Sequence, residues 1–144
     1  MLKSSTLKHS ASNLLIPYES LTDDQVLAIN HLYENDHTLL IANMGGGKTV
    51  VSLTALSELL DEGVIKRALV IAPLKVANAV WSSEAGKWEH LQPLTDEINV
   101  CTGTAAHRKK MLKKRGKITI VNFEAIPWLV DQPEMKDFDA LIVD

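Results

Sequence analysis

The apolar residues of this chain fall into short continuous runs. Five of these runs predict β-strands, at residues 39–42, 67–73, 97–101, 117–123 and 138–144. An unbroken apolar run of this length is typical of a strand that is buried on both faces of a parallel sheet. The hydrophobic pattern therefore predicts a sheet with buried strands as the centre of the fold.

The segments around these runs predict helices, at residues 21–33, 50–61, 75–88, 104–116 and 124–130. In residues 21–33 the apolar positions recur every three or four residues, which gives one apolar face. Residues 131–139 are acidic and contain Pro133, so we expect a connecting loop there. Alternation of strands and helices predicts an α/β fold with a mostly parallel sheet and helices on both faces. Residues 18–144 form the predicted domain, and residues 1–17 a flexible N-terminal tail.

A glycine-rich turn joins the first predicted strand to the next helix. It reads Ala42-Asn43-Met44-Gly45-Gly46-Gly47-Lys48-Thr49. Glycines let consecutive backbone N–H groups converge on phosphate oxygens, and the helix that follows adds its positive N-terminal end. We therefore predict a phosphate-binding loop for ATP, in which Lys48 reaches the β- and γ-phosphates and the Thr49 hydroxyl binds Mg²⁺. The alternative, an ordinary turn with an exposed lysine, leaves three consecutive glycines unexplained.

A carboxylate follows the last apolar run. Four apolar residues precede Asp144, which is the form of a Walker B strand. A carboxylate at the tip of a buried strand can hold Mg²⁺ opposite the hydroxyl of the phosphate-binding loop. The alternative is an incidental aspartate after an ordinary strand. The predicted phosphate-binding loop leads us to favour the interpretation of Asp144 as a metal ligand.

Gln25 has two interpretations. With Thr22 as N-cap, Gln25 stands at the third helical position and completes a capping box. Its side-chain amide could instead donate to and accept from adenine. Its position 23 residues before Lys48 leads us to favour the adenine contact.

Composition changes this picture little. The chain has 144 residues, 46% of them hydrophobic, and a net charge of −3, so any nucleic-acid contact must be local. A single cysteine, Cys101, fits a reducing compartment, and no apolar run is long enough to span a membrane. Seven lysines and arginines lie between residues 108 and 117. They form either a solvated charged face or a contact to phosphates.

These ordered motifs resemble the first RecA-like domain of superfamily 2 helicases, most closely the SNF2-like translocases and their phage relatives. The phosphate-binding loop of that group has the form Ala-x-x-Gly-x-Gly-Lys-Thr, which explains why an alanine, Ala42, stands at its first position. Residues 69–74 with Trp81 and Glu84 look like motif Ia, and residues 120–124 look like a later DNA-proximal motif. Val143-Asp144 would open motif II, and Gln25 looks like the adenine-reading glutamine.

The resemblance implies an ATP- and Mg²⁺-dependent motor domain that acts on DNA, with RNA as the alternative, in the cytoplasm of a bacterium or phage-infected host or in a nucleus. The expected catalytic residues are Lys48 and Asp144. The residues expected to bind the nucleotide are Gln25, Met44, Gly45, Gly46, Gly47, Lys48 and Thr49. The residues expected to contact nucleic acid are Pro73, Leu74, Lys75, Thr102, Gly103, Asn122 and Phe123.

The motif II glutamate and the second RecA-like domain, which carries the arginine finger, are missing from this sequence. We therefore expect this chain alone to hydrolyse ATP weakly or not at all. A stand-alone nucleotide-binding module is the second hypothesis. A small kinase is the third, and it would need an acceptor site that the sequence does not reveal.

Overall fold

A parallel sheet forms the centre of the structure, a computed structural model that describes residues 14–40 and 47–144. Its strands are β1 (Ala68–Ala72), β2 (Ile98–Val100), β3 (Ile118–Asn122) and β4 (Ala140–Val143). They lie in the order β2-β3-β1-β4, and every pairing is parallel. The parallel α/β fold predicted from the sequence is confirmed.

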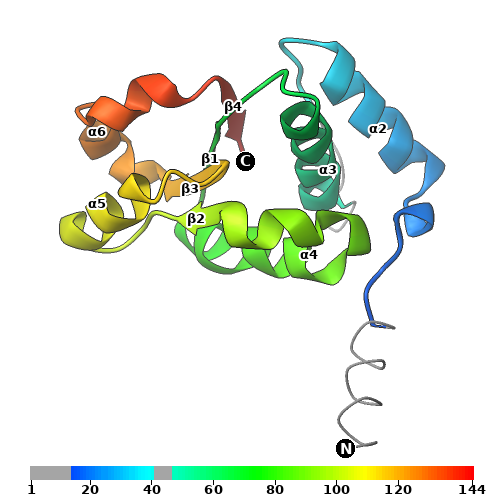
Figure 1. The fold of residues 1–144 in the computed structure, drawn as a ribbon, viewed down its shortest axis with the longest axis horizontal. Helices are drawn as coiled ribbons and strands as arrows, with labels where there is room; N and C mark the ends of the chain where they lie inside the picture. The colour runs from blue at the N-terminus through cyan, green and yellow to red at the C-terminus, as the bar shows by residue number, and fades with distance from the viewer. Residues whose placement is uncertain (1–13, 41–46) are drawn as a thin grey trace, which may run out of the picture.

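Helices cover both faces of this sheet (Figure 1). On one face lie α3 (Lys48–Asp61) and α4 (Trp81–Lys87), and α2 (Asp23–Glu34) packs on the outer side of α3. The other face carries α5 (Ala105–Lys113) and α6 (Ile126–Leu129). Shorter helical segments connect these elements: η1 (Tyr18–Ser20), η2 (Val76–Val80), η3 (Glu89–Glu97), η4 (Phe123–Ala125) and η5 (Pro133–Asp137).

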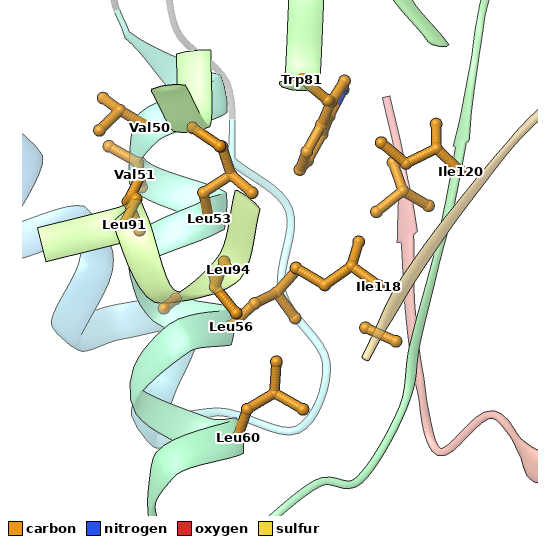
Figure 2. Close-up of a cluster of buried hydrophobic side chains, with 14 of the residues drawn as sticks. Val50, Val51, Leu53, Leu56, Leu60, Trp81, Leu91, Leu94, Ile118 and Ile120 are labelled. Atoms are coloured by element: carbon orange, nitrogen blue, oxygen red, sulfur yellow. The ribbon is translucent and has the colours of Figure 1, made fainter. Parts of the chain in front are cut away.

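Two apolar clusters, one on each face, hold the layers together. The larger joins α3 and α4 to the sheet, with Leu53, Trp81 and Ile120 almost fully buried (Figure 2). The smaller places Leu112 and Leu129 from the opposite helices against Val121. Because β1 and β3 contribute alternate residues to the two clusters, the continuous apolar runs of these two strands are accounted for.

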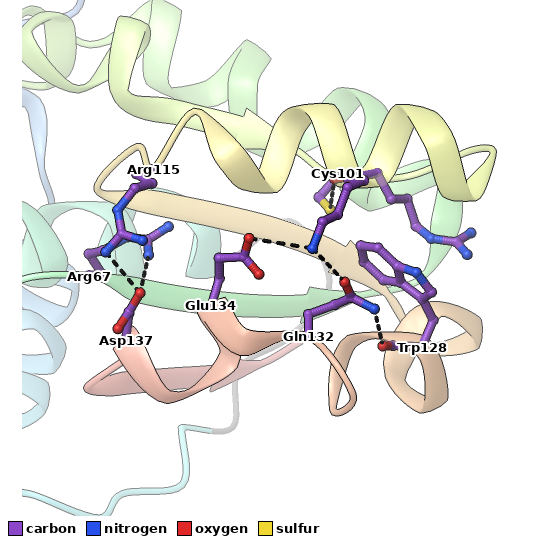
Figure 3. Close-up of polar contacts among 9 residues, drawn as sticks. Arg67, Cys101, Arg115, Trp128, Gln132, Glu134 and Asp137 are labelled. Atoms are coloured by element: carbon purple, nitrogen blue, oxygen red, sulfur yellow. Dashed lines mark hydrogen bonds and ion pairs between the residues drawn. The ribbon is translucent and has the colours of Figure 1, made fainter.

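Polar contacts fix the amino-terminal edge of the sheet. The Asp139 carboxylate accepts backbone N–H bonds from Lys66 at 2.9 Å and Arg67 at 3.0 Å, which sets the register of β4 beside β1. The buried Arg67 guanidinium lies near Asp137, which also pairs with Arg115 at 2.8 Å (Figure 3). This edge is therefore structural.

The start of α2 confirms the predicted capping box. Gln25 N–H donates to Thr22 Oγ1 at 3.1 Å, and Thr22 N–H donates to Gln25 Oε1 at 2.9 Å.

Before α2, Ile16 pairs with Trp88 in a single parallel bridge, and the Ile16 N–H donates to the Lys87 carbonyl. The end of the predicted tail is thus in contact with the domain.

Three predicted elements differ from the structure. The helix predicted at 75–88 begins as the π-helix η2 before it becomes α4. The loop predicted at 131–139 contains the 3-10 turn η5. The strand predicted at 39–42 is wrong where it is described: residues 38–40 are irregular, and Leu39 is 81% exposed. Residues 38–40 line a cavity together with β4 and have no strand pairing within the described part of the chain, so the apolar run alone does not make a strand here.

None of the helices in the described residues has both the length and the apolar character that crossing a bilayer requires.

Candidate functional site

The site begins at the amino terminus of α3. Gly47 is the N-cap residue, in the left-handed region at φ 74°, and no side chain of residues 14–40 and 47–144 caps this helix. Lys48 and Thr49 occupy the first turn, which contains no acidic residue. By contrast, Thr22 caps α2 and Thr104 caps α5 through their hydroxyls. The first N–H groups of α3 are therefore left to bind an anion such as phosphate.

Buried residues on α3 hold this turn in place. Val50 and Leu53 have 1% and 0% of their surface exposed, whereas Lys48 projects into solvent. Met44, Gly45 and Gly46 of the predicted phosphate-binding loop lie outside the described residues. The described part of the loop is therefore Gly47, Lys48 and Thr49.

Gln25 stands beside this loop. A Cβ atom added to Gly47 would overlap Gln25 Nε2, so the amide lies against the N-cap of α3. The structure shows the capping-box role of Gln25, which is the interpretation that we placed second. The adenine contact stays a prediction.

Asp144 follows β4 at the carboxyl edge of the sheet. Its backbone N–H donates to the Ile71 carbonyl at 2.8 Å, which continues the β1–β4 pairing by one residue. Its carboxylate is exposed, and Oδ2 accepts a hydrogen bond of 3.1 Å from the indole Nε1–H of Trp81. The predicted metal ligand is thus an exposed residue whose carboxylate is oriented by a buried donor.

One cavity brings the two halves of the site together. It has a volume of about 960 Å³, and its walls include Lys48, Thr49, Trp81 and Asp144. It lies between α3 and the free edge of β4, with residues 35–40 along another side. Lys48 and Asp144, which are far apart in the sequence, therefore line the same space.

These groups fit a magnesium ion that is shared with a nucleotide. Within residues 14–40 and 47–144, no three His, Cys, Asp or Glu side chains gather into a metal-holding group. Mg²⁺ is commonly held by one or two carboxylates together with substrate phosphates rather than by an all-protein cage. One hydroxyl from Thr49 and one carboxylate from Asp144 are the donors that such a shared ion needs.

The residues predicted to contact nucleic acid share the carboxyl edge of the sheet. Residues 73–75 follow β1, residues 102–103 follow β2, and Asn122 with Phe123 ends β3. Pro73, Leu74, Lys75, Gly103 and Phe123 are exposed, whereas Thr102 and Asn122 are buried. The structure thus brings these segments to one edge, beside Asp144, because all the strands run in the same direction.

Two of these residues have partners within the fold. Thr102 Oγ1 donates to Asn78 Oδ1 at 2.6 Å, which ties β2 to η2. Asn122 Nδ2 donates to Glu124 Oε2 at 2.9 Å, while the buried Asn122 Oδ1 has no partner among the described residues. Both side chains therefore shape the edge, and the Asn122 side chain retains a buried acceptor without a partner among the described residues.

The basic segment of residues 108–117 divides into two groups. Arg108 stacks on the Trp128 ring at 4.7 Å, Lys109 binds Gln132 and Glu134, and Arg115 pairs with Asp137 (Figure 3). The other four residues are exposed: Lys110, Lys113, Lys114 and Lys117. Three of the seven charges thus hold α5 against the layer formed by α6 and η5. The exposed four are the ones that fit a phosphate contact.

Cys101 is no candidate for a nucleophile. Its thiol is buried and donates to the Arg108 carbonyl at 3.3 Å, and burial raises the pKa of the thiol to about 11. The thiol therefore stays protonated at neutral pH, and the residue packs as a small apolar side chain.

The contacts that Trp81 and Asn78 make depend on the tertiary fold and could not be predicted from the sequence. Trp81 belongs to the segment that resembles motif Ia, and its indole reaches a carboxylate 63 positions later in the chain. Asn78 lies on a π-helix, whose wider turn changes which residues face the sheet. A regular helical projection of residues 75–88 could not have placed either side chain correctly.

Comparisons with known proteins point to one family of motor domains. The sequence profile of the DEAD/DEAH box helicases matches residues 22–144. Protein p41 of Acyrthosiphon pisum secondary endosymbiont phage 1 is 41% identical over 109 residues, which cover 74% of this chain and 23% of that protein. Chromodomain-helicase-DNA-binding protein 8 of Xenopus tropicalis is 27% identical over 141 residues, which cover 86% of this chain and 6% of that protein. The chain therefore spans less than a quarter of the length of either relative.

Proposed function

Because the chain belongs to the DEAD/DEAH box helicase family, a superfamily 2 group of motor domains, we propose that it is the ATP-binding N-terminal domain of an SNF2-like DNA translocase. One observation carries the proposal: Lys48, Thr49 and Asp144 line a single cavity at the carboxyl edge of a parallel sheet. Ligands of open α/β sheets bind at this edge. The 27% identity to a chromodomain-helicase-DNA-binding protein supports the SNF2-like assignment.

The proposed roles follow from the chemistry of each side chain. The Lys48 ammonium and the free N–H groups of α3 neutralise the phosphates. The Thr49 hydroxyl and the Asp144 carboxylate hold Mg²⁺, which when bound neutralises charge on the β- and γ-phosphates. Gln25 contacts the adenine ring through its carboxamide. Each role uses a group that is exposed or half-buried at the cavity or beside Gly47.

We propose that DNA lies along the rest of the same edge, over residues 73–75, 102–103 and 122–123. The exposed backbone and Lys75 suit phosphates, and contacts of this kind do not depend on base sequence. Translocation and rapid hydrolysis would also require a second RecA-like domain, since an arginine finger alone can contribute about 10³-fold or more in rate.

Calorimetry of ATP binding in Mg²⁺ tests the nucleotide site. Lys48→Ala removes the main cation, and we expect binding to fall below detection. Lys114→Ala is the matched control, because Lys114 is an exposed lysine at the C-cap of α5, which lies on the opposite face of the sheet from α3. Equal affinity of the Lys48→Ala variant and the unchanged chain would refute the assignment.

Binding of a fluorescent single-stranded or duplex DNA tests the second face. We expect affinity to fall as salt rises, because cations released from phosphates dominate such binding. Lys75→Ala should weaken binding and reduce the salt dependence. Lys66→Ala is the control, since Lys66 is exposed at the opposite end of β1. Equal losses in the two variants would argue against the proposed edge.

A further inference from the structure

The Asp144 carboxylate is held by a tryptophan. Trp81 Nε1–H donates to Asp144 Oδ2 at 3.1 Å, and the two residues are 63 positions apart. Trp81 is only 1% exposed, whereas Asp144 is exposed. A fully buried aromatic ring thus extends its single polar atom to the surface of the cavity described above.

Packing determines where this indole points. Trp81 belongs to the larger apolar cluster, in which it lies between α3 and Ile120 of the sheet (Figure 2). The π-helix η2 ends at Val80, directly before it. A π-helix has more residues per turn than an α-helix, so it rotates every later residue about the helix axis. The wide turn therefore decides that Trp81 faces β4.

The chemistry of the pair suits a metal ligand. An indole N–H only donates, so it engages the ionised carboxylate and cannot compete with it for a cation. It occupies Oδ2, and within the described part of the chain Asp144 Oδ1 accepts no hydrogen bond. One oxygen is thus fixed and the other is available to a cation or to its water. Donors of this kind orient metal ligands in many proteins.

We propose that Trp81 is a positioning residue, which holds the Asp144 carboxylate in the orientation that binds nucleotide-bound Mg²⁺. This inference rests on the proposed function, since it assigns Trp81 a role in the same ATP site. Trp81 does not touch the nucleotide. It acts through Asp144.

A second tryptophan provides a matched control. Trp88 Nε1 donates to Glu84 Oε1, also at 3.1 Å, and Trp88 is 6% exposed. The two pairs have the same donor, acceptor and length, but Glu84 is absent from the cavity wall. Trp81→Phe and Trp88→Phe therefore remove equivalent hydrogen bonds and nearly equal apolar volumes.

The test measures how Mg²⁺ strengthens the binding of a fluorescent ATP analogue. In Trp81→Phe we expect the Mg²⁺ concentration for half-maximal binding to rise about tenfold, as is typical when a ligand-orienting group is lost, with binding in EDTA unchanged. In Trp88→Phe it should stay within about twofold of the original value. Equal Mg²⁺ dependence in the two variants would overturn the inference. If the unchanged chain binds no nucleotide, the proposed function fails, and this inference fails with it.

A second measurement covers the case in which Trp81→Phe does not fold. The chain has three tryptophans, so three indole N–H signals are expected in a nitrogen–proton NMR spectrum of the unchanged chain. When Mg²⁺ is added to the nucleotide-bound chain, the Trp81 signal should shift because its acceptor now binds a cation. The Trp88 signal should not move. A Trp81 signal that stays fixed while Mg²⁺ binds would also overturn the inference.

Discussion

Replacement of Gly47 by alanine should destabilise the domain in a way that depends on Gln25. Gly47 has φ 74° and ψ 30°, a left-handed conformation that costs an L-residue about 1–2 kcal/mol. The new Cβ would also overlap Gln25 Nε2, with Val50 Cγ1 only 3.5 Å away. Gln25 must then move, although its Oε1 accepts a hydrogen bond from Thr22 N–H.

The two costs add to a predictable total. Loss of the Thr22–Gln25 bond costs about 1 kcal/mol, which is the usual net value of such a bond. Together with the backbone term, Gly47→Ala should lower the free energy of unfolding by about 2–3 kcal/mol. With a urea m-value of about 2 kcal/mol per molar for a domain of this size, the midpoint should fall by about 1 M.

A double-mutant cycle identifies the cause. In a Gln25→Ala background the side chain that Gly47→Ala displaces is absent, so only the backbone term of about 1–2 kcal/mol should remain. The coupling free energy between the two positions should therefore be about 1 kcal/mol. Urea unfolding followed by circular dichroism measures all four chains. A coupling of zero would show that Gln25 does not lie against the loop.

Two further predictions concern the same layer of the fold. Gln25→Glu keeps the capping box but loses the amide donor, so stability should stay the same while ATP affinity falls about tenfold; unchanged calorimetric affinity would refute the adenine contact. Burial lowers the pKa of His90, and the opposing charge of Glu19 offsets only part of this shift. The unfolded chain therefore binds more protons than the folded chain, so the free energy of unfolding should fall as pH drops below about 6.5. His90→Gln should flatten this dependence between pH 7.5 and 5.5 in urea titrations, and an unchanged slope would contradict it.

The parts of the fold that sequence reasoning recovered are those that depend on nearby residues. The apolar runs of β1 and β3 and the capping box of α2 follow from side chains within a few positions of each other. The order of the strands does not, because it depends on which edges meet after the chain has folded. The segment of residues 38–40 shows the limit: it belongs to an apolar run but is irregular in the structure, because strand formation depends on pairing and packing as well as on the run itself.

The residues of the candidate site also divide into those that a local sequence motif identifies and those that only tertiary packing identifies. Lys48, Thr49 and Asp144 were identifiable from local motifs, and the structure places all three on one cavity. The indole that orients Asp144 was not, because a π-helix determines its direction and tertiary packing stabilises that π-helix. Motifs thus indicate the groups that touch a ligand, while the groups that position them are found in the packing.

Gln25 shows how the structure can change an argument made from sequence. In the sequence, the cap and the adenine contact compete for one side chain. In the structure, Oε1 accepts one hydrogen bond from Thr22 N–H, which uses one of its two lone pairs. The second lone pair and the amino group remain, and the amino group lies beside Gly47. The cap therefore fixes the carboxamide next to Gly47, and the predicted adenine contact would be made by a side chain whose rotamer entropy is already lost.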